Sequence, residues 1–264
     1  MNKKISLCLL VATLFATFEV HAWGGFGHGA IAYVAEQHLT PETKEKCRHY
    51  LKHTLPYYAS WMDHWRAVPP FDPTNAWHGF SATGENHVNW EKGNGKAMGE
   101  IMRIVKSMEK GQYKSMSDSL VRHNLLILVH ALPDMHCPVH VGFSRKDFPD
   151  YRYSLKRNGK PFKMHGFWDG SPGFTRKGWS YERYAAEVDK ITPKQAKKIV
   201  KKGNYDYWGD DICTQAHRAY KITPANKDIA RLTAEEKEEV LKLSDEMAMK
   251  AAYRLAYVIN TIFK

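Results

Sequence analysis

A strongly apolar segment at residues 117–131 constrains the fold of this chain more than any other feature. Its hydrophobic residues are Leu120, Val121, Leu125, Leu126, Ile127, Leu128 and Val129. Apolar residues around most of a helix indicate that the helix is buried on nearly all sides. The segment therefore predicts a central helix, around which the rest of the chain must pack.

Helical spacing continues along most of the remaining sequence. Ile31, Val34 and Ala35 recur three or four residues apart, and Thr40 and Pro41 form the start of a helix that should run to about residue 52. Further helices are expected at 97–110, near 180–190, and at 193–202, 206–220 and 233–262. We expect 54–95 to be a long loop with short helical pieces, and a small hairpin near 142–178. These segments predict an all-α fold, built as a single compact multi-helix domain.

The first 22 residues have the organisation of a secretory signal peptide. Lys3 and Lys4 precede an apolar run at 5–18, and residues 20–22 form a small-residue cleavage site. The apolar run is too short to span a bilayer. We therefore expect cleavage between Ala22 and Trp23, a mature domain over 23–264, and a periplasmic or secreted protein without stable membrane association.

Cleavage at this site would make Trp23 the first residue of the mature chain. Its free α-amine and its own carbonyl oxygen are two metal-binding groups that no internal residue has together. His28 lies five residues further on, and Gly24, Gly25 and Gly27 let the chain between them bend back sharply. The pattern predicts that Trp23 and His28 share a metal site, which signal cleavage completes.

The segment 130–140 carries the strongest pattern of metal ligands within the chain. His130 and Asp134 are four residues apart and share one face of a helix, and His140 follows where that helix should end. Pro133 lies between them, where it removes a helical hydrogen bond and bends the helix. These three side chains are therefore candidates for one metal region.

Two more pairs of histidine and aspartate have related spacings. His165 and Asp169 repeat the four-residue separation, and Asp63 precedes His78 by fifteen residues. A single pair of this kind is more often a hydrogen-bonded pair on a helix, but the combined set favours a metal centre. Zinc binds histidine nitrogen and aspartate oxygen, and a site without thiolates is typical of catalytic zinc.

The charge and the cysteines narrow the class of protein only weakly. The whole chain has 39 basic and 28 acidic residues, an excess that suits an anionic partner such as nucleic acid or an anionic lipid surface. Such an excess is also common in exported proteins, where it favours solubility. Once Cys8 leaves with the signal, Cys47, Cys137 and Cys213 remain, so at most one disulfide forms.

In this order the motifs resemble the S1/P1 nucleases, zinc-dependent enzymes whose mostly helical fold is shared with zinc-dependent phospholipase C. The matching segments are 23–28, 61–66, 77–78, 130–140, 165–169, 208–220 and 254–260. The resemblance implies three zinc ions per chain. It assigns the first zinc to Asp63, His78 and His130, and the second zinc to His28 with the amine and carbonyl of Trp23. Asp134 would bridge these two zinc ions. The third zinc is assigned to His140, His165 and Asp169.

The same resemblance implies the reaction. Zinc-activated hydroxide would hydrolyse single-stranded DNA and RNA to 5′-phosphorylated products, with removal of 3′-phosphates from nucleotides as a second activity, and the enzyme would act as a monomer. Asp63 and Arg66 are the predicted catalytic residues, with Arg66 pairing with phosphate oxygens. Phe80 or Trp90 would stack on a base of the substrate.

Several alternatives remain open at this point. His87 competes with His78 for the first site, because the sequence His87-Val-Asn also resembles the family pattern. The segment 152–163 stands where the family has a glycine- and asparagine-rich stretch, which affects base recognition. A zinc-dependent phospholipase C and a non-catalytic exported metal-binding protein are the alternative functions.

Overall fold

The computed structural model describes residues 23–84, 86–91, 95–144, 146 and 153–264. The predicted signal peptide at 1–22 lies outside the described residues, as does Arg152. The α-helices are α1 Gly24–Gln37, α2 Pro41–Leu51, α3 Trp61–Trp65, α4 Ala97–Met108, α5 Asp118–His136, α6 Met164–Asp169, α7 Tyr181–Val188, α8 Pro193–Val200, α9 Tyr205–Ile222 and α10 Ala234–Phe263. The predicted all-α fold class is confirmed.

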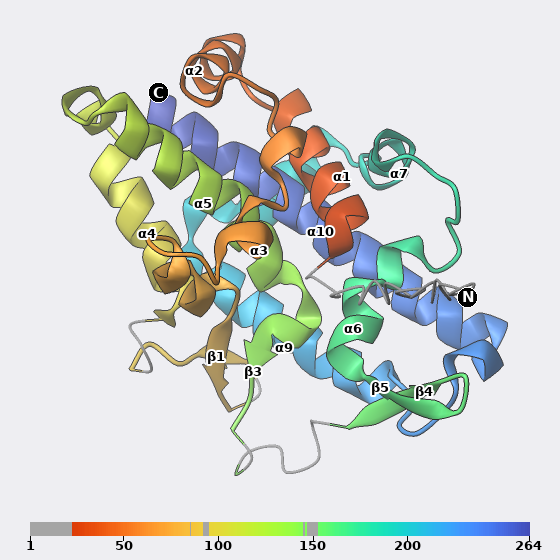
Figure 1. Ribbon diagram of the computed structural model, residues 1–264. Coiled ribbons are helices and arrows are strands. Elements are labelled where there is room, and N and C mark those ends of the chain that lie inside the picture. The colour runs from red at the N-terminus through yellow and green to blue at the C-terminus, as the bar shows by residue number, and fades with distance from the viewer. Residues whose placement is uncertain (1–22, 85, 92–94, 145, 147–152) are drawn as a thin grey trace, which may run out of the picture.

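Helix α5 is the central helix that the apolar segment predicts. Ser117 caps it by accepting a hydrogen bond from the backbone N–H of Leu120, and every residue from Asn124 to His136 is buried. The helix packs against α4 and α10. Figure 1 shows α10, in blue, running behind α5 and α1 along the length of the molecule. A capping box between Thr233 and Glu236 starts α10, which packs against α1 as well.

Several helix boundaries agree with the sequence. Thr40 accepts a hydrogen bond from the N–H of Thr43 and α2 ends at Leu51, one residue before the expected limit. Helix α4 ends at Met108, slightly before the predicted end at residue 110. The short helix α6 was not predicted, although it carries two of the predicted ligands. No helix in the described part of the chain is both long and apolar enough to cross a membrane.

Short strands accompany the helices. The first sheet has the order β2-β1-β3, with β1 Phe80–Thr83 antiparallel to β2 His87–Val88 and parallel to β3 Val141–Gly142. These strands were not predicted, since 54–95 was expected to be loop and helical turns. The predicted hairpin is present as β4 Ser154–Arg157 and β5 Lys160–Lys163.

Pairing of β1 with β3 brings two distant loops together. Gly79 precedes β1 and packs so closely on His140 that a Cβ atom at this position would collide with the His140 carbonyl oxygen. The ring of His140 donates a short hydrogen bond from Nδ1 to the carbonyl oxygen of His78. The small sheet therefore places His78 and His140 on the same side of α5.

A buried polar network links helices α5, α9 and α10. Arg254 of α10 is fully buried, and its Nη1 lies 3.0 Å from Nε2 of His136. Its Nη2 donates to Asp211 of α9 at 2.6 Å, and Lys250 donates to the same carboxylate at 2.7 Å. The charge of Arg254 is therefore compensated inside the protein.

Candidate metal centre

Helix α5 presents His130 and Asp134 on one buried face, one turn apart. The Nδ1 atom of His130 donates to the carbonyl oxygen of Ala59 at 2.7 Å. This bond leaves Nε2 with its lone pair directed into the protein, where it lies 3.2 Å from Oδ2 of Asp134. Both side chains are fully buried, so they form the floor of the site.

The first cluster unites Asp63 of α3, His78 after the turn η2 (Asp72–Trp77), and His130. Donor atoms of these three side chains all lie within 4.8 Å of one another. His130 Nε2 is 3.7 Å from Asp63 Oδ1, and His78 Nδ1 is 3.8 Å from the same oxygen. The structure thus brings together the three residues assigned to the first zinc by resemblance.

His87 lies apart from this cluster. Its side chain on β2 is 70% exposed, and its Nδ1 pairs with Oδ1 of Asp210 at 3.2 Å. His78 instead lies 2.7 Å from Asp134 and is almost completely buried. Of the two candidates left open by the sequence, His78 is therefore the one that lies within a group of possible metal ligands.

The second cluster consists of His28, His130 and Asp134. His28 comes from α1, and its Nε2 lies 2.9 Å from Oδ1 of Asp134. Its ring stacks on that of His130 with centroids 4.2 Å apart. Burial, together with the nearby charge of His130, lowers the pKa of His28. The neutral imidazole that results is the form that binds metals.

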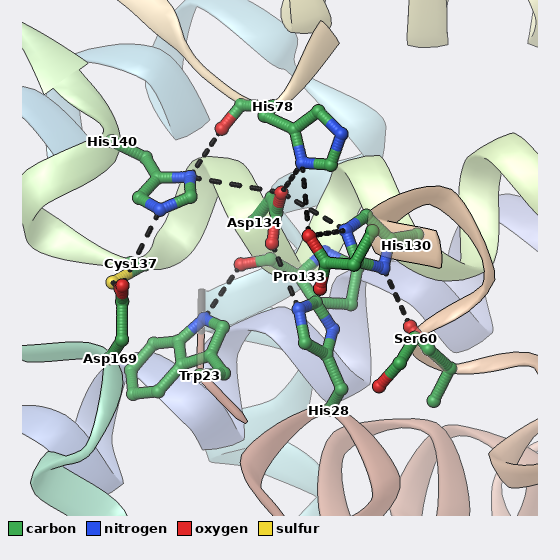
Figure 2. A network of polar contacts seen from close by, with 12 residues as sticks. Trp23, His28, Ser60, His78, His130, Pro133, Asp134, Cys137, His140 and Asp169 are labelled. Atoms are coloured by element: carbon green, nitrogen blue, oxygen red, sulfur yellow. Dashed lines mark hydrogen bonds and ion pairs between the residues drawn. The ribbon is translucent and has the colours of Figure 1, made fainter. Parts of the chain in front are cut away.

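Trp23 lies at the start of α1, beside the second cluster (Figure 2). Its side chain is 1% exposed, and the indole Nε1 donates to the carbonyl oxygen of Pro133 at 2.8 Å. The carbonyl oxygen of Trp23, a predicted ligand, accepts a hydrogen bond from the N–H of Gly27 at 2.9 Å in the first turn of α1. A carbonyl oxygen has two lone pairs, so this bond leaves one for a metal.

The third group of donors lies where α5 and α6 end. His165 Nε2 is 3.1 Å from Asp169 Oδ2, His140 Nε2 is 3.6 Å from Asp169 Oδ1, and the two histidine rings stack with centroids 4.7 Å apart. His140 and Asp169 therefore lie in one group of possible ligands, whereas His165 is 51% exposed and lies at the edge of that group, next to Asp169. Cys137, which was not among the predicted site residues, joins them, because its Sγ lies 3.4 Å from Asp169 Oδ1.

Buried histidine and aspartate atoms that make no well-aligned hydrogen bond are concentrated in these clusters. They are Nδ1 and Nε2 of His28, Nε2 of His78, His130 and His140, Oδ1 of Asp134 and Oδ2 of Asp169. Buried polar atoms in proteins are nearly always hydrogen-bonded, and the usual exceptions have a functional reason such as a bound ion. Histidine nitrogens and aspartate oxygens are ligands of zinc, so the donor set fits this metal.

The electrostatics of the cluster also suit a cation. Burial opposes the charge on Asp134, but His130 and His140 outweigh it and hold the pKa of this carboxyl well below its usual range. Burial likewise opposes protonation of His140, yet Asp134 and Asp169 raise its pKa to about 9. The carboxylates of Asp134 and Asp169 are therefore stabilised by positive charge nearby. A divalent metal would supply this charge in place of the protons on the histidine rings.

A cavity of about 660 Å³ opens beside these clusters. His78, His140 and His165 line it, together with three cationic side chains, Arg66, Lys96 and Lys163, and with Phe80, Tyr153 and Tyr220. Arg66 lies on the wall with its Nη1 3.9 Å from Oδ1 of Asp63.

Phe80 is only 2% exposed, which leaves little of its ring for stacking on a base. Trp90 is 37% exposed and does not line this cavity.

An all-α domain with buried histidine and aspartate clusters beside a cationic cavity has the features of a metal-dependent phosphoesterase. The S1/P1 Nuclease family profile matches residues 23–264, and the chain belongs to this family. It is 22% identical to Nuclease S1 of Aspergillus oryzae over 97% of both chains. It is also 27% identical to Nuclease P1 of Penicillium citrinum, over 45% of this chain and 47% of that one. The protein is thus a hydrolase acting on phosphodiester bonds.

Three residues beside the predicted ligands, Cys137, Lys96 and Lys163, were not among the predicted site residues. Cys137 was counted only as a partner for a disulfide, whereas all three cysteines in the described chain are free thiols. Its position between Asp134 and His140, three residues from each, is a signal that was available in the sequence. Lys96 and Lys163 carry no such signal, because only the fold brings them to the cavity.

Proposed function

We propose that the protein is a zinc-dependent nuclease that hydrolyses single-stranded DNA and RNA to 5′-phosphorylated products, with three zinc ions per chain. The observation that carries the proposal is the convergence of buried histidine and aspartate donors on one cavity whose wall holds Arg66. When bound, zinc would activate a water molecule as the nucleophile and neutralise charge on the phosphate. The second activity, on 3′-phosphates of nucleotides, follows from the same chemistry.

The chain's own residues orient the metals and the substrate. Asp134 lies within 3.2 Å of His28, His78 and His130, so its two oxygens suit the role of a bridge between the first two sites. The Ala59 carbonyl fixes the tautomer of His130. Arg66 has a planar fork of N–H donors that matches phosphate oxygens, and it lines the cavity next to Asp63.

The shape of the site supports a preference for unpaired strands. His28, His130 and Asp134 are fully buried, whereas His78, His140 and His165 line the cavity, so a phosphate would approach the clusters from the cavity. An unpaired nucleotide can enter a pocket of this size, whereas a nucleotide in a duplex must first leave its stack. Lys96 and Lys163 add positive charge on the cavity wall for flanking phosphates.

The proposal includes the processing of the chain. Cleavage between Ala22 and Trp23 would release a single mature domain over 23–264 into the periplasm or the medium, as a monomer, and would free the Trp23 amine for the second zinc. The burial of Trp23 beside His28 supports this assignment.

The test uses the mature chain starting at Trp23, loaded with zinc. We expect about three zinc ions per chain by elemental analysis, cleavage of single-stranded DNA and RNA well above a duplex of the same sequence, and 5′-phosphate ends. His78→Ala should abolish cleavage, whereas His87→Ala, which changes an exposed histidine away from the clusters, should leave it intact. Hydrolysis of phosphatidylcholine instead of nucleic acid, or zinc uptake without turnover, would contradict the proposal.

A further inference from the structure

Cys137 is a buried thiol that donates a hydrogen bond to Asp169 and lies among side chains that can bind a metal. It is the C-cap of α5, where its backbone N–H closes the helix by donating to the carbonyl oxygen of Asp134 at 2.9 Å. Its side chain is fully buried and faces Asp169 of α6, with Sγ 3.4 Å from Oδ1 (Figure 2). The thiol therefore lies between two elements that carry ligands proposed above.

The spacing of three donor atoms, from Cys137, His140 and Asp169, fits neighbouring positions of a tetrahedron, and Nε2 of His165 lies 3.1 Å from the second oxygen of Asp169. Zinc bonds of about 2.0–2.3 Å place neighbouring ligand atoms of a tetrahedron about 3.3–3.8 Å apart. Sγ of Cys137 and Oδ1 of Asp169 are 3.4 Å apart, and Nε2 of His140 and the same oxygen are 3.6 Å apart. Donor atoms of all three residues lie within 4.8 Å of one another.

Two further observations at this cluster point to an ion. Nε2 of His140 and Oδ2 of Asp169 are buried and make no well-aligned hydrogen bond, and the polar atoms nearest to them belong to the same group of possible metal ligands. His140 donates from Nδ1 to the carbonyl oxygen of His78, so its Nε2 faces Asp169 and lies within 4.8 Å of the Cys137 thiol. Both atoms are therefore aimed at the position a metal would take.

The other two thiols provide a contrast. Cys47 and Cys213 are also buried and free, but neither belongs to a cluster of metal-binding side chains within the residues that the structure describes. Burial alone thus does not explain the position of Cys137.

We propose that the thiolate of Cys137 is a fourth protein ligand of the third zinc site, together with His140, His165 and Asp169. This inference rests on the proposed function for the presence of the metal. Binding would form a zinc–sulfur bond and release the thiol proton to solvent. We expect a zinc with this fourth protein ligand to be held more tightly than a site with three ligands would hold it.

The experiment measures sulfur coordination directly. X-ray absorption of the zinc-loaded mature protein should show a sulfur neighbour at about 2.3 Å, distinct from nitrogen and oxygen at about 2.0–2.2 Å. The cobalt-substituted protein should show a thiolate-to-cobalt charge-transfer band in the near ultraviolet. The double variant Cys47→Ser, Cys213→Ser leaves Cys137 as the one thiol of the mature chain and should keep both signals, whereas Cys137→Ser should lose them and release one zinc to a chelator faster.

Each outcome decides the inference. A wild-type spectrum with nitrogen and oxygen neighbours alone overturns it, whether or not the Cys137→Ser variant folds. If such a protein still binds zinc and cleaves single-stranded DNA, the proposed function stands while the role of Cys137 falls. A protein that holds no zinc and cleaves no nucleic acid contradicts both.

Discussion

The indole of Trp23 donates a buried hydrogen bond of 2.8 Å to the carbonyl oxygen of Pro133. This carbonyl is among the last four of α5, which lack partners within the helix. The backbone N–H of Cys137, four residues after Pro133, donates instead to the carbonyl oxygen of Asp134. The side chain of Trp23 thus ties the start of α1 to the residue that precedes the proposed bridging carboxylate.

Trp23→Phe keeps an aromatic ring but removes the indole N–H. The buried carbonyl of Pro133 would lose its donor, and we expect the free energy of unfolding to fall by about 1–3 kcal/mol. Chemical denaturation of the zinc-free mature protein measures this change. Trp65→Phe is the matched control, because Trp65 is 43% exposed and should change stability by less than about 0.5 kcal/mol. Equal effects of the two substitutions would contradict the role of this bond.

A residue added ahead of Trp23 should remove one zinc. The extension converts the free amine into an amide, which is a poor ligand, so the second site would lose a donor. Elemental analysis should show the metal content falling by one ion per chain, and nuclease activity should fall with it. The same residue added after Lys264 should have neither effect. Full zinc content and activity in the extended form would refute the amine ligand.

Asp134→Asn should abolish cleavage and release at least one zinc. The carboxylate faces His28, His78 and His130, and an amide of the same size cannot supply two anionic oxygens to two metals. Asp210→Asn changes an exposed carboxylate that pairs with His87 and should leave both properties unchanged. Retention of all the zinc by the Asp134 variant would rule out a bridging role.

Arg66→Ala should lower kcat/KM on single-stranded DNA by about 100-fold or more, because a cationic donor for the phosphate would be lost. Arg66→Lys should restore only part of the rate, since an ammonium group lacks the planar fork. Zinc content should not change in either variant. Arg103→Ala, on the exposed side of α4, serves as the control. A rate unchanged in the alanine variant would exclude Arg66 from catalysis.

The network around Arg254 predicts a pH-dependent contribution to stability. Burial opposes the charge on Asp211, but Arg254 and Lys250 outweigh it and lower its pKa below the ordinary value. A lowered pKa contributes stability that is present above the ordinary aspartate range and is lost as the pH falls through the lowered value. Asp211→Asn should therefore destabilise the protein by about 3 kcal/mol near pH 7, because it leaves Arg254 buried without its counter-charge.

Denaturant titrations of both proteins over a range of pH measure this difference. The gap between wild type and Asp211→Asn should stay constant down to about pH 4 and then narrow. Glu187→Gln, which alters an exposed pair with Lys190, should show no measurable change at any pH. A gap that does not depend on pH would mean that Asp211 acts through packing and not through its charge.

The parts of this fold that depend on local sequence could be predicted. Helix α2 starts at Pro41 because Thr40 caps it, and α10 starts where Thr233 and Glu236 form a capping box. The spacing of His130 and Asp134 determined that both would face one side of α5. These features need only residues within one or two turns of each other.

Contacts between distant segments could not be predicted in the same way. Strand β1 pairs with the distant strand β3, in which Val141 opposes Phe80, as well as with its neighbour β2. The choice between His78 and His87 likewise depended on this sheet, which points one histidine at α5 and leaves the other in solvent. Cys137 was overlooked because its role depends on α6, which brings Asp169 to the end of α5.

The two ends of the proposed mature chain differ in a way that matters for handling the protein. Trp23 is enclosed beside the candidate metal clusters, with its side chain 1% exposed, whereas Lys264 is exposed beyond the end of α10 (Figure 1). Affinity tags, fluorescent labels and linkages to a solid support therefore belong after Lys264. A recombinant form should begin at Trp23. Export with signal cleavage, or cleavage of a fusion protein directly before Trp23, would produce it.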